Sequence, residues 1–355
     1  MAQNMETLFA TLNNLVQPVC FLQNGVVTMC NSACKAIFLA EGVSADGLLG
    51  DVILPKGSEK VSLPCHWGET RYTATLQSWE DGHLCFLAKQ EQFSPTAPTL
   101  AAVRSMTPAL EELIHAGSEL FPMLEEQEDE HLQGLTATMC HALFRLMRAS
   151  NVMGDFFRIC REDSVAHREK VALKAFFDDF ARYAKDVLAD AGYPLIYTGP
   201  DKLKNGTLDT LEVQTAMLHL LSNAAKFSPK GSEIRLTVTS LGKTMRISVQ
   251  SAGVMEEDVL PSAFCRYEHP EHLDSRQGAG MGLALVQAVA RRHGGSVLLQ
   301  AEETGTEVLM TVDVSQPESP VSDKMVPVFH GFDPYLVALA DILPTSTFDS
   351  RNIDL

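Results

Sequence analysis

Two short segments carry residues that could bind a metal-bound polyphosphate. In the first, His219, Asn223 and Lys226 follow at intervals of four and three residues, which brings all three onto one face of a helix. The amide oxygen of Asn223 is a hard, neutral ligand that suits Mg²⁺, and the ammonium group of Lys226 can meet phosphate charge. The alternative interpretation is an ordinary amphipathic helix with a solvated polar face.

The second segment has glycines at alternate positions directly before a predicted helix. Gly278, Gly280 and Gly282 lead into Leu283 and an apolar helical pattern that ends at His293. Glycines let the backbone approach a polyphosphate, and a helix start offers unpaired N–H groups and the positive end of the helix dipole. A dinucleotide-binding fold is rejected, because no parallel strand directly precedes the glycines and no acidic residue follows about 20 positions later. The segment therefore indicates anion binding.

In this order the two segments resemble the N box and the second glycine box of sensor histidine kinases, within the wider family of gyrase-type and Hsp90-type ATPases. The resemblance is carried by LLSNAAKFSPKGSEIRLTV and GAGMGLALVQAVARRHGGSV. It implies that ATP is the ligand, that Asn223 holds Mg²⁺, and that Lys226 contacts phosphate. Hydrolytic branches of the family carry a general-base Glu where this chain has His219, so the resemblance favours a kinase-type domain.

The resemblance also implies further contacts to the nucleotide. The backbone of the three glycines and Leu283 would line the phosphates, and two aromatic residues, Phe264 and Tyr267, would precede a lid at about 268–277. These implied site residues complete a nucleotide pocket whose adenine side is expected at the end of the strand predicted over 244–249.

The first glycine box departs from the family pattern, which is Asp-x-Gly-x-Gly. Gly253 is present, but Ser251 stands where the family has the Asp that accepts a hydrogen bond from the adenine amino group, and Met255 stands near the second glycine. Losing a buried charged acceptor costs about 1.5–3 kcal/mol, or roughly tenfold to a hundredfold in affinity. The sequence therefore leaves weak or absent ATP binding open.

A long helical region over 103–162 precedes this domain. Its second helix has a heptad seam with intervals of four and three, formed by Met139, Leu143, Leu146, Ser150, Met153, Phe157 and Cys160. A narrow seam predicts a helical hairpin that forms a four-helix bundle with a second copy. His141 falls on the outer face of the seam and is the candidate phosphoacceptor. Family acceptors are followed by an acidic residue, whereas Ala142 follows here, so an exposed structural histidine is the alternative.

The whole chain is predicted to be an α+β multidomain protein. A PAS-like sensor domain is indicated by short apolar runs around the hairpin signal Asn24-Gly25. The pair Asp333-Pro334 predicts the cap and first turn of a short docking helix. The predicted parts are a PAS-like domain (1–90), a linker (91–102), a dimerising helical hairpin (103–162), an ATPase domain with the α/β-sandwich of the Bergerat type (163–315), and a linker with the docking helix (316–355).

Charge and hydropathy exclude other classes of partner. The net charge of -17, without a basic run, argues against a nucleic-acid surface. No apolar stretch approaches the roughly 20 residues that a membrane span needs, and the first residues lack the pattern of a signal peptide. We therefore expect a cytoplasmic protein with no membrane span and no nucleic-acid partner.

The functional hypothesis is a protein histidine kinase of a two-component phosphorelay. It would move the γ-phosphoryl group of Mg·ATP to His141 and then to an aspartate of a response regulator. One alternative is an inactive pseudokinase scaffold that sequesters a signalling partner, which Ser251 and Ala142 favour. Another is a kinase of the anti-sigma type that phosphorylates Ser or Thr on a partner and needs no His141.

Overall fold

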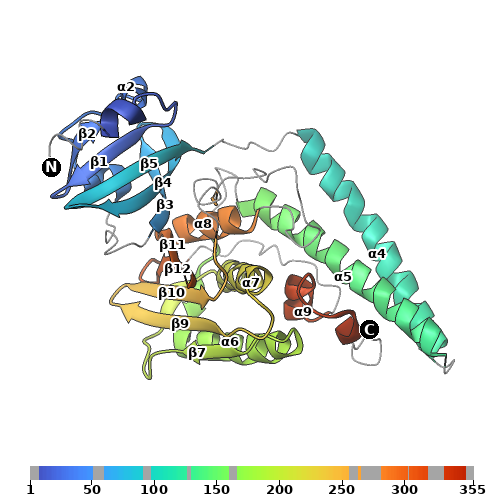
Figure 1. Ribbon diagram of the computed structural model, residues 1–355. Helices are drawn as coiled ribbons and strands as arrows, with labels where there is room; N and C mark the ends of the chain where they lie inside the picture. The colour runs from blue at the N-terminus through green and yellow to red at the C-terminus, as the bar shows by residue number, and fades with distance from the viewer. Residues whose placement is uncertain are drawn as a thin grey trace.

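The computed structural model describes residues 8–50, 60–90, 97–125, 129–159, 166–255, 263–264, 281–302, 304–318 and 332–348. Within these residues the fold is mixed α+β (Figure 1). Its strands are β1 (Val19–Gln23), β2 (Val26–Cys30), β3 (Lys60–Trp67), β4 (Thr70–Trp79), β5 (Gly82–Lys89), β6 (Glu169–Val171), β7 (Leu195–Thr198), β8 (Gly206–Leu208), β9 (Ile234–Leu241), β10 (Thr244–Ser251), β11 (Val297–Glu302) and β12 (Gly305–Asp313). Its helices are α2 (Ser32–Ala36), α3 (Ala45–Leu49), α4 (Ala97–Glu125), α5 (Glu130–Ile159), α6 (Leu173–Asp190), α7 (Thr210–Phe227), α8 (Gly282–Arg292) and α9 (Pro334–Leu339), with a 3₁₀ turn, η2 (Thr345–Phe348).

The first five strands form an antiparallel unit with α2 and α3 and a core of their own. The hairpin expected at Asn24-Gly25 joins β1 to β2, and both turn residues have positive φ, at 52° and 76°. An asparagine followed by a glycine tolerates this left-handed backbone, which matches the twist of the two strands. The local sequence signal for this hairpin is confirmed.

A single sheet runs through both β-rich parts of the chain. Its order is β2-β1-β5-β4-β3-β11-β12-β10-β9-β7, and the two parts meet where β3 pairs antiparallel with β11. That junction aligns Ser62 with Leu299 and Lys60 with Ala301. The sequence signals did not predict this pairing, because neither strand's pattern of buried residues specifies a partner more than two hundred positions away.

Helices α4 and α5 form a long antiparallel hairpin beside the sheet (Figure 1). Helix α4 begins at Ala97, within the range 91–102 that was predicted as linker, and it continues through Pro122 to Glu125. A proline is tolerated in the first turn of a helix, so Pro98 agrees with the earlier start. In the described residues, no helix is long and apolar enough to cross a membrane.

The second β-rich part carries α6, α7 and α8 over one face of its sheet, with the larger core between them. The chain then returns, and α9 packs against α5, α6 and α7 (Figure 1). Asp333 caps α9 as predicted, since its side chain accepts a hydrogen bond from the Tyr335 backbone N–H at 2.7 Å. The helix ends at Leu339.

Candidate functional site

Helix α7 positions the polar residues of the first segment. It starts where the Asp209 side chain accepts a hydrogen bond from the Glu212 backbone N–H at 3.1 Å, and it ends before Ser228-Pro229. Such a cap satisfies one of the unpaired N–H groups of the first turn. The apolar residues of α7 lie in the larger core, which fixes the rotation of the helix and the direction of its polar side chains.

The glycine that starts α8 lies directly against the polar face of α7. A Cβ atom on Gly282 would lie 3.4 Å from Asn223 Nδ2, 3.6 Å from Asn223 Oδ1 and 3.5 Å from His219 Nδ1. The start of α8, whose N-cap residue Met281 makes no side-chain cap hydrogen bond, therefore faces the amide of Asn223. A helix N-terminus beside a neutral oxygen ligand suits an anion with its metal ion.

The end of β10 completes this junction from the other side. A Cβ atom on Gly253 would lie 2.7 Å from the Phe227 carbonyl oxygen, so only glycine fits between β10 and the end of α7. The Gly253 carbonyl in turn accepts a hydrogen bond from Thr306 Oγ1 at 2.6 Å. Ser251 is buried in β10 and borders an open hollow of about 290 Å³.

Two residues of the polar face of α7 differ in what they contact. Burial, reinforced by the charges of Arg148 and Lys226, lowers the pKa of His219 to about 3, so this ring is neutral at physiological pH. Lys226 points to the carboxy-terminal segment, where its Nζ lies 2.7 Å from Asp341 Oδ2. Burial and the Arg148 charge lower the pKa of Lys226 to about 8. The predicted phosphate contact is therefore already paired with a carboxylate of the same chain.

His141 is not on an open outer face, and this corrects the expectation. The ring stacks on Phe348 with centroids 4.6 Å apart and an interplanar angle of 6°. Its Nε2 lies 2.9 Å from the Ala340 carbonyl oxygen, which can only accept, and its Nδ1 lies 3.2 Å from Thr345 Oγ1. Nε2 therefore donates to the carbonyl, and in the neutral ring Nδ1 accepts from the hydroxyl. The heptad pattern missed this cover, because the covering residues lie about 200 positions later in the chain.

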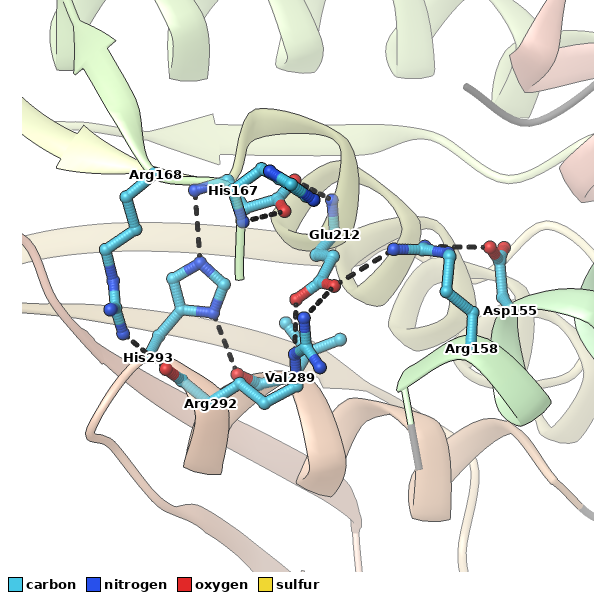
Figure 2. Close-up of polar contacts among 9 residues, drawn as sticks. Asp155, Arg158, His167, Arg168, Glu212, Val289, Arg292 and His293 are labelled. Atoms are coloured by element: carbon cyan, nitrogen blue, oxygen red, sulfur yellow. Dashed lines mark hydrogen bonds and ion pairs between the residues drawn. The ribbon is translucent and has the colours of Figure 1, made fainter. Parts of the chain in front are cut away.

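A second polar cluster, at the start of α7, was missed by sequence reasoning. Figure 2 shows Glu212 between Arg158 of α5 and Arg292 of α8, at 3.1 Å from Arg158 Nη1 and 2.9 Å from Arg292 Nη2. Arg158 also pairs with Asp155 at 2.9 Å. Burial raises the pKa of Glu212 to about 7 with help from Asp209, although both arginines oppose the shift. The sequence carried no signal for this cluster, because the arginine partners of Glu212 come from α5 and α8.

The remaining predicted site residues are only partly described. Phe264 is buried in the larger core, and Leu283 is half-buried against it. Tyr267, Gly278 and Gly280 lie outside the described residues, as does Cys160 of the predicted seam. The described part of the site is therefore the junction of α7, the end of β10 and the start of α8. Among the described residues, no group of three or more His, Cys, Asp or Glu side chains is placed to hold a metal ion.

Comparison with known proteins agrees with this junction. A family model described as "Histidine kinase-, DNA gyrase B-, and HSP90-like ATPase" matches residues 208–316, which contain α7, β9, β10, α8, β11 and β12. Residues 208–316 form a histidine-kinase-type ATP-binding domain. The resemblance drawn from the N box and the second glycine box is thus confirmed.

Curated relatives of this domain are bacterial sensor kinases. The sensor protein KdpD of Clostridium acetobutylicum is 34% identical over 101 residues, which are 28% of this chain and 11% of that protein. The sensor histidine kinase CusS of Escherichia coli K12 is 29% identical over 139 residues, or 38% of this chain and 28% of CusS. The histidine protein kinase DivJ of Caulobacter vibrioides is 31% identical over 109 residues, or 30% of this chain and 18% of DivJ. The match therefore spans less than a third of each relative's own length.

Solved structures give partial likenesses. Full-length ShkA in complex with AMPPNP aligns with 59% of this chain and 47% of its own, at 19% identity and a TM-score of 0.46. The histidine kinase ThkA in complex with the response regulator protein TrrA aligns with 86% of this chain and 98% of its own, at 13% identity and a TM-score of 0.42. At these scores the likenesses do not extend the assignment beyond the ATP-binding domain.

Proposed function

We propose that this protein is a signal-transducing kinase of the histidine kinase type that binds Mg·ATP at the junction of α7 and α8. The observation that carries the proposal is the packing of Gly282 against Asn223 and His219. A Cβ atom at position 282 would lie 3.4–3.6 Å from their side-chain atoms. The residues fit the ligand: Asn223 offers a neutral oxygen to Mg²⁺, and the first backbone N–H groups of α8 point to the phosphates. The family resemblance implies that Gly278 and Gly280, which lie outside the described residues, would add backbone contacts to the phosphates and that Gly253 and Ser251 would form the adenine side.

The proposed reaction is phosphoryl transfer to His141. The bond between the γ-phosphorus and its bridging oxygen breaks, a bond to an imidazole nitrogen forms, and the leaving oxygen stays on ADP. The protein contributes positioning and charge neutralisation by Asn223, Lys226 and the backbone of α8. Because Nε2 of His141 carries a proton and Nδ1 accepts a hydrogen bond, the ring must leave Ala340 and Thr345 before either nitrogen can attack. The phosphoryl group would then pass to an aspartate of a response regulator.

A pseudokinase scaffold is the second candidate, and specific observations favour it. Ser251 replaces the adenine-binding Asp, Lys226 is paired with Asp341, and His141 has both ring nitrogens engaged. In this case the ATP-binding domain serves as a surface that sequesters a signalling partner. A kinase that phosphorylates Ser or Thr on a partner is the third candidate.

Incubation of the purified protein with γ-labelled ATP separates the three candidates. Acid-labile label that disappears in His141→Ala supports the histidine kinase, and acid-stable label on a partner supports the Ser/Thr kinase. No label on a folded protein that still binds ATP supports the scaffold. Calorimetry should detect ATP binding that weakens at least about tenfold in Asn223→Ala or without Mg²⁺, since both changes remove metal coordination. Equal affinity of Asn223→Ala and wild type would contradict the assignment of Asn223 to the metal.

The proposed assembly is a homodimer through the helical hairpin. Exposed apolar residues recur on both helices: Met106, Leu113, Leu120, Leu135, Met139 and Leu146. Of the predicted seam, Leu143 and Phe157 are instead buried within the chain, so only part of the seam is available to a partner. Because a charge in an apolar interface is costly, Met139→Glu should shift the sedimentation coefficient to that of a monomer. Ala175→Glu, which adds the same charge at an exposed position of α6 outside the hairpin, should leave the dimer intact.

The remaining parts of the proposal concern the input. The antiparallel unit of β1 to β5 is proposed to be a PAS-like sensor domain, and the protein is proposed to act in the cytoplasm. The pairing of β3 with β11 supports direct mechanical coupling between this unit and the ATP-binding domain. A signal that shifts β3 would reach β12 and β10 through backbone hydrogen bonds.

A further inference from the structure

The segment 332–348, here called the tail, occupies the groove between α5 and α7. It follows the ATP-binding domain in the chain and packs against α5, α6 and α7 (Figure 1). Its apolar side chains are buried in the larger core: Phe332, Tyr335, Val337, Leu339, Leu343 and Phe348. Burial of these side chains favours the docked tail, and the conformational entropy of ordering the segment opposes it.

The first set of polar contacts covers His141. The tail stacks Phe348 on the imidazole, and it engages both ring nitrogens through the Ala340 carbonyl and the Thr345 hydroxyl. Phe348 also packs against Phe144, with ring centroids 4.9 Å apart. The tail therefore excludes any phosphoryl donor from this histidine while it is bound.

The second set brings three cations to one carboxylate. Asp341 contacts Arg148 and Lys226, and its Oδ1 lies 3.6 Å from Arg145 Nε. The side chains of Arg148 and Lys226 are only 9% and 6% exposed, so water cannot easily replace the carboxylate. Arg148 also donates to Ser222 Oγ at 3.0 Å, one position before Asn223. An anion with more charge than one carboxylate would satisfy the same cations better.

The contact between the tail and the two helices is incompletely packed. A cavity of about 40 Å³ lies between α5, α7 and α9, and it is lined by Asn151, His219, Val337 and Ala338 among others. The buried Nδ2 of Asn151 has no hydrogen-bond partner within the described part of the chain. A buried donor left without a partner raises the free energy of the docked state, so the tail is held less firmly than its apolar contacts alone would imply.

From these contacts we infer that the tail is a displaceable internal clamp, which holds Lys226 through Asp341 and covers His141, so that phosphate groups at α7 compete with it. The inference rests on the proposed nucleotide site and names its regulation. Release of the tail has two effects together: it removes the Asp341 carboxylate from Lys226, and it exposes the His141 imidazole. By linkage, a nucleotide that competes with the tail must weaken the tail's docking by the same factor.

The test uses the full chain with two tail variants and one control. Asp341→Asn removes the charge that holds the cations and keeps the shape of the side chain, whereas Phe348→Ala removes the stack on His141 and leaves the charges in place. Asp186→Asn removes one negative charge at an exposed position of α6 and serves as the control. Unfolding curves establish that each variant is folded.

Two readouts need no nucleotide. Backbone hydrogen exchange of 332–348 and carbethoxylation of His141, both followed by mass spectrometry, should rise about tenfold in the tail variants and stay at the wild-type level in Asp186→Asn. The fully buried ring of His293, which the tail does not contact, is the internal reference for carbethoxylation. Unchanged exchange and unchanged His141 reactivity in both tail variants would overturn the clamp, because these contacts would then not hold the tail.

The third readout links the clamp to the nucleotide. Mg·ATP should bind about tenfold more tightly to the tail variants, and it should raise hydrogen exchange of 332–348 in wild type by a similar factor. A released tail with wild-type nucleotide affinity overturns the clamp and leaves the proposed nucleotide site standing. Absence of binding by every form, including those with a released tail, instead overturns the proposed nucleotide site itself.

Discussion

Helix α7 is tied to α5 at both of its ends, and the two ion clusters differ in the source of their carboxylate. At the start of α7, Glu212 of α7 itself pairs with Arg158 of α5 and is fully buried. At its last turn, Lys226 reaches α5 only through Asp341 of the tail, whose side chain is 19% exposed. The first cluster is built from α5, α7 and α8, whereas the second needs the tail.

The two carboxylates also titrate differently. Burial and the neighbouring Asp209 raise the pKa of Glu212 to about 7. Burial also opposes ionisation of Asp341, but the charges of Arg148 and Lys226 prevail and lower its pKa below the usual value. A carboxylate with several cations and some access to water stays charged, so the second cluster is an ionic contact at neutral pH. This difference suits a permanent joint at one end of α7 and a releasable one at the other.

Breaking the first cluster should have the largest effect on stability. Arg158→Met removes the cation between Asp155 and Glu212 and leaves two buried acids without it. Removing one partner of a buried ion pair costs about 3–5 kcal/mol, so the free energy of unfolding in urea should fall by about that amount at pH 8. Arg182→Met removes an exposed pair with Asp179 on α6, and its loss of stability should be much smaller, because solvent screens that pair.

The loss of unfolding free energy in Arg158→Met should depend on pH, because the acids of this cluster titrate. Because the pKa of Glu212 in the fold lies above its ordinary value of 4.5, its contribution to stability is complete below 4.5 and is lost as pH rises through about 7. Without Arg158 the pKa of Glu212 rises further. The difference in unfolding free energy between Arg158→Met and wild type should therefore shrink as the pH falls toward about 5. A difference that is constant from pH 5 to pH 8 would show that ionised acids are not its cause.

His219 offers an intermediate effect that reports on the second cluster. Burial first, then Arg148 and Lys226, lower its pKa from 6.5 to about 3. Because the pKa of His219 is depressed, its contribution to the free energy of unfolding is fully present above pH 6.5. This contribution is lost as the pH falls toward 3, at up to about 1.4 kcal/mol per pH unit. His219→Gln should therefore lose less stability than wild type between pH 6.5 and pH 4, as measured by urea unfolding at each pH. Parallel curves for the two proteins would mean that folding does not depress the pKa of this ring.

The contrast between the two clusters also separates what the sequence could predict from what it could not. Local periodicity and glycines are enough to predict helix α7, the β9–β10 pair and the start of α8. The resemblance to histidine kinases predicted that Asn223 and Gly282 belong to one site, and the two residues do lie together. The cover on His141 could not be predicted, because its contact with Thr345 spans 204 positions and no spacing rule encodes it. Glu212 was predicted as part of a helix, but its arginine partners come from two other elements.

Salt should weaken the second cluster and leave the first nearly unchanged, which is the smallest of these expected effects. Between about 0.1 M and 1 M salt the Debye length falls from about 10 Å to about 3 Å, and only charges with access to solvent respond strongly. Arg145 is half exposed beside Asp341, whereas the Glu212 side chain has no exposed surface. Hydrogen exchange of 332–348 should therefore rise several-fold with salt in wild type but not in Asp341→Asn, whose tail no longer depends on the ion pairs. An equal rise in the residues of α7 around Glu212 would show that the two clusters are held in the same way, and that the tail is as permanent as the rest of the fold.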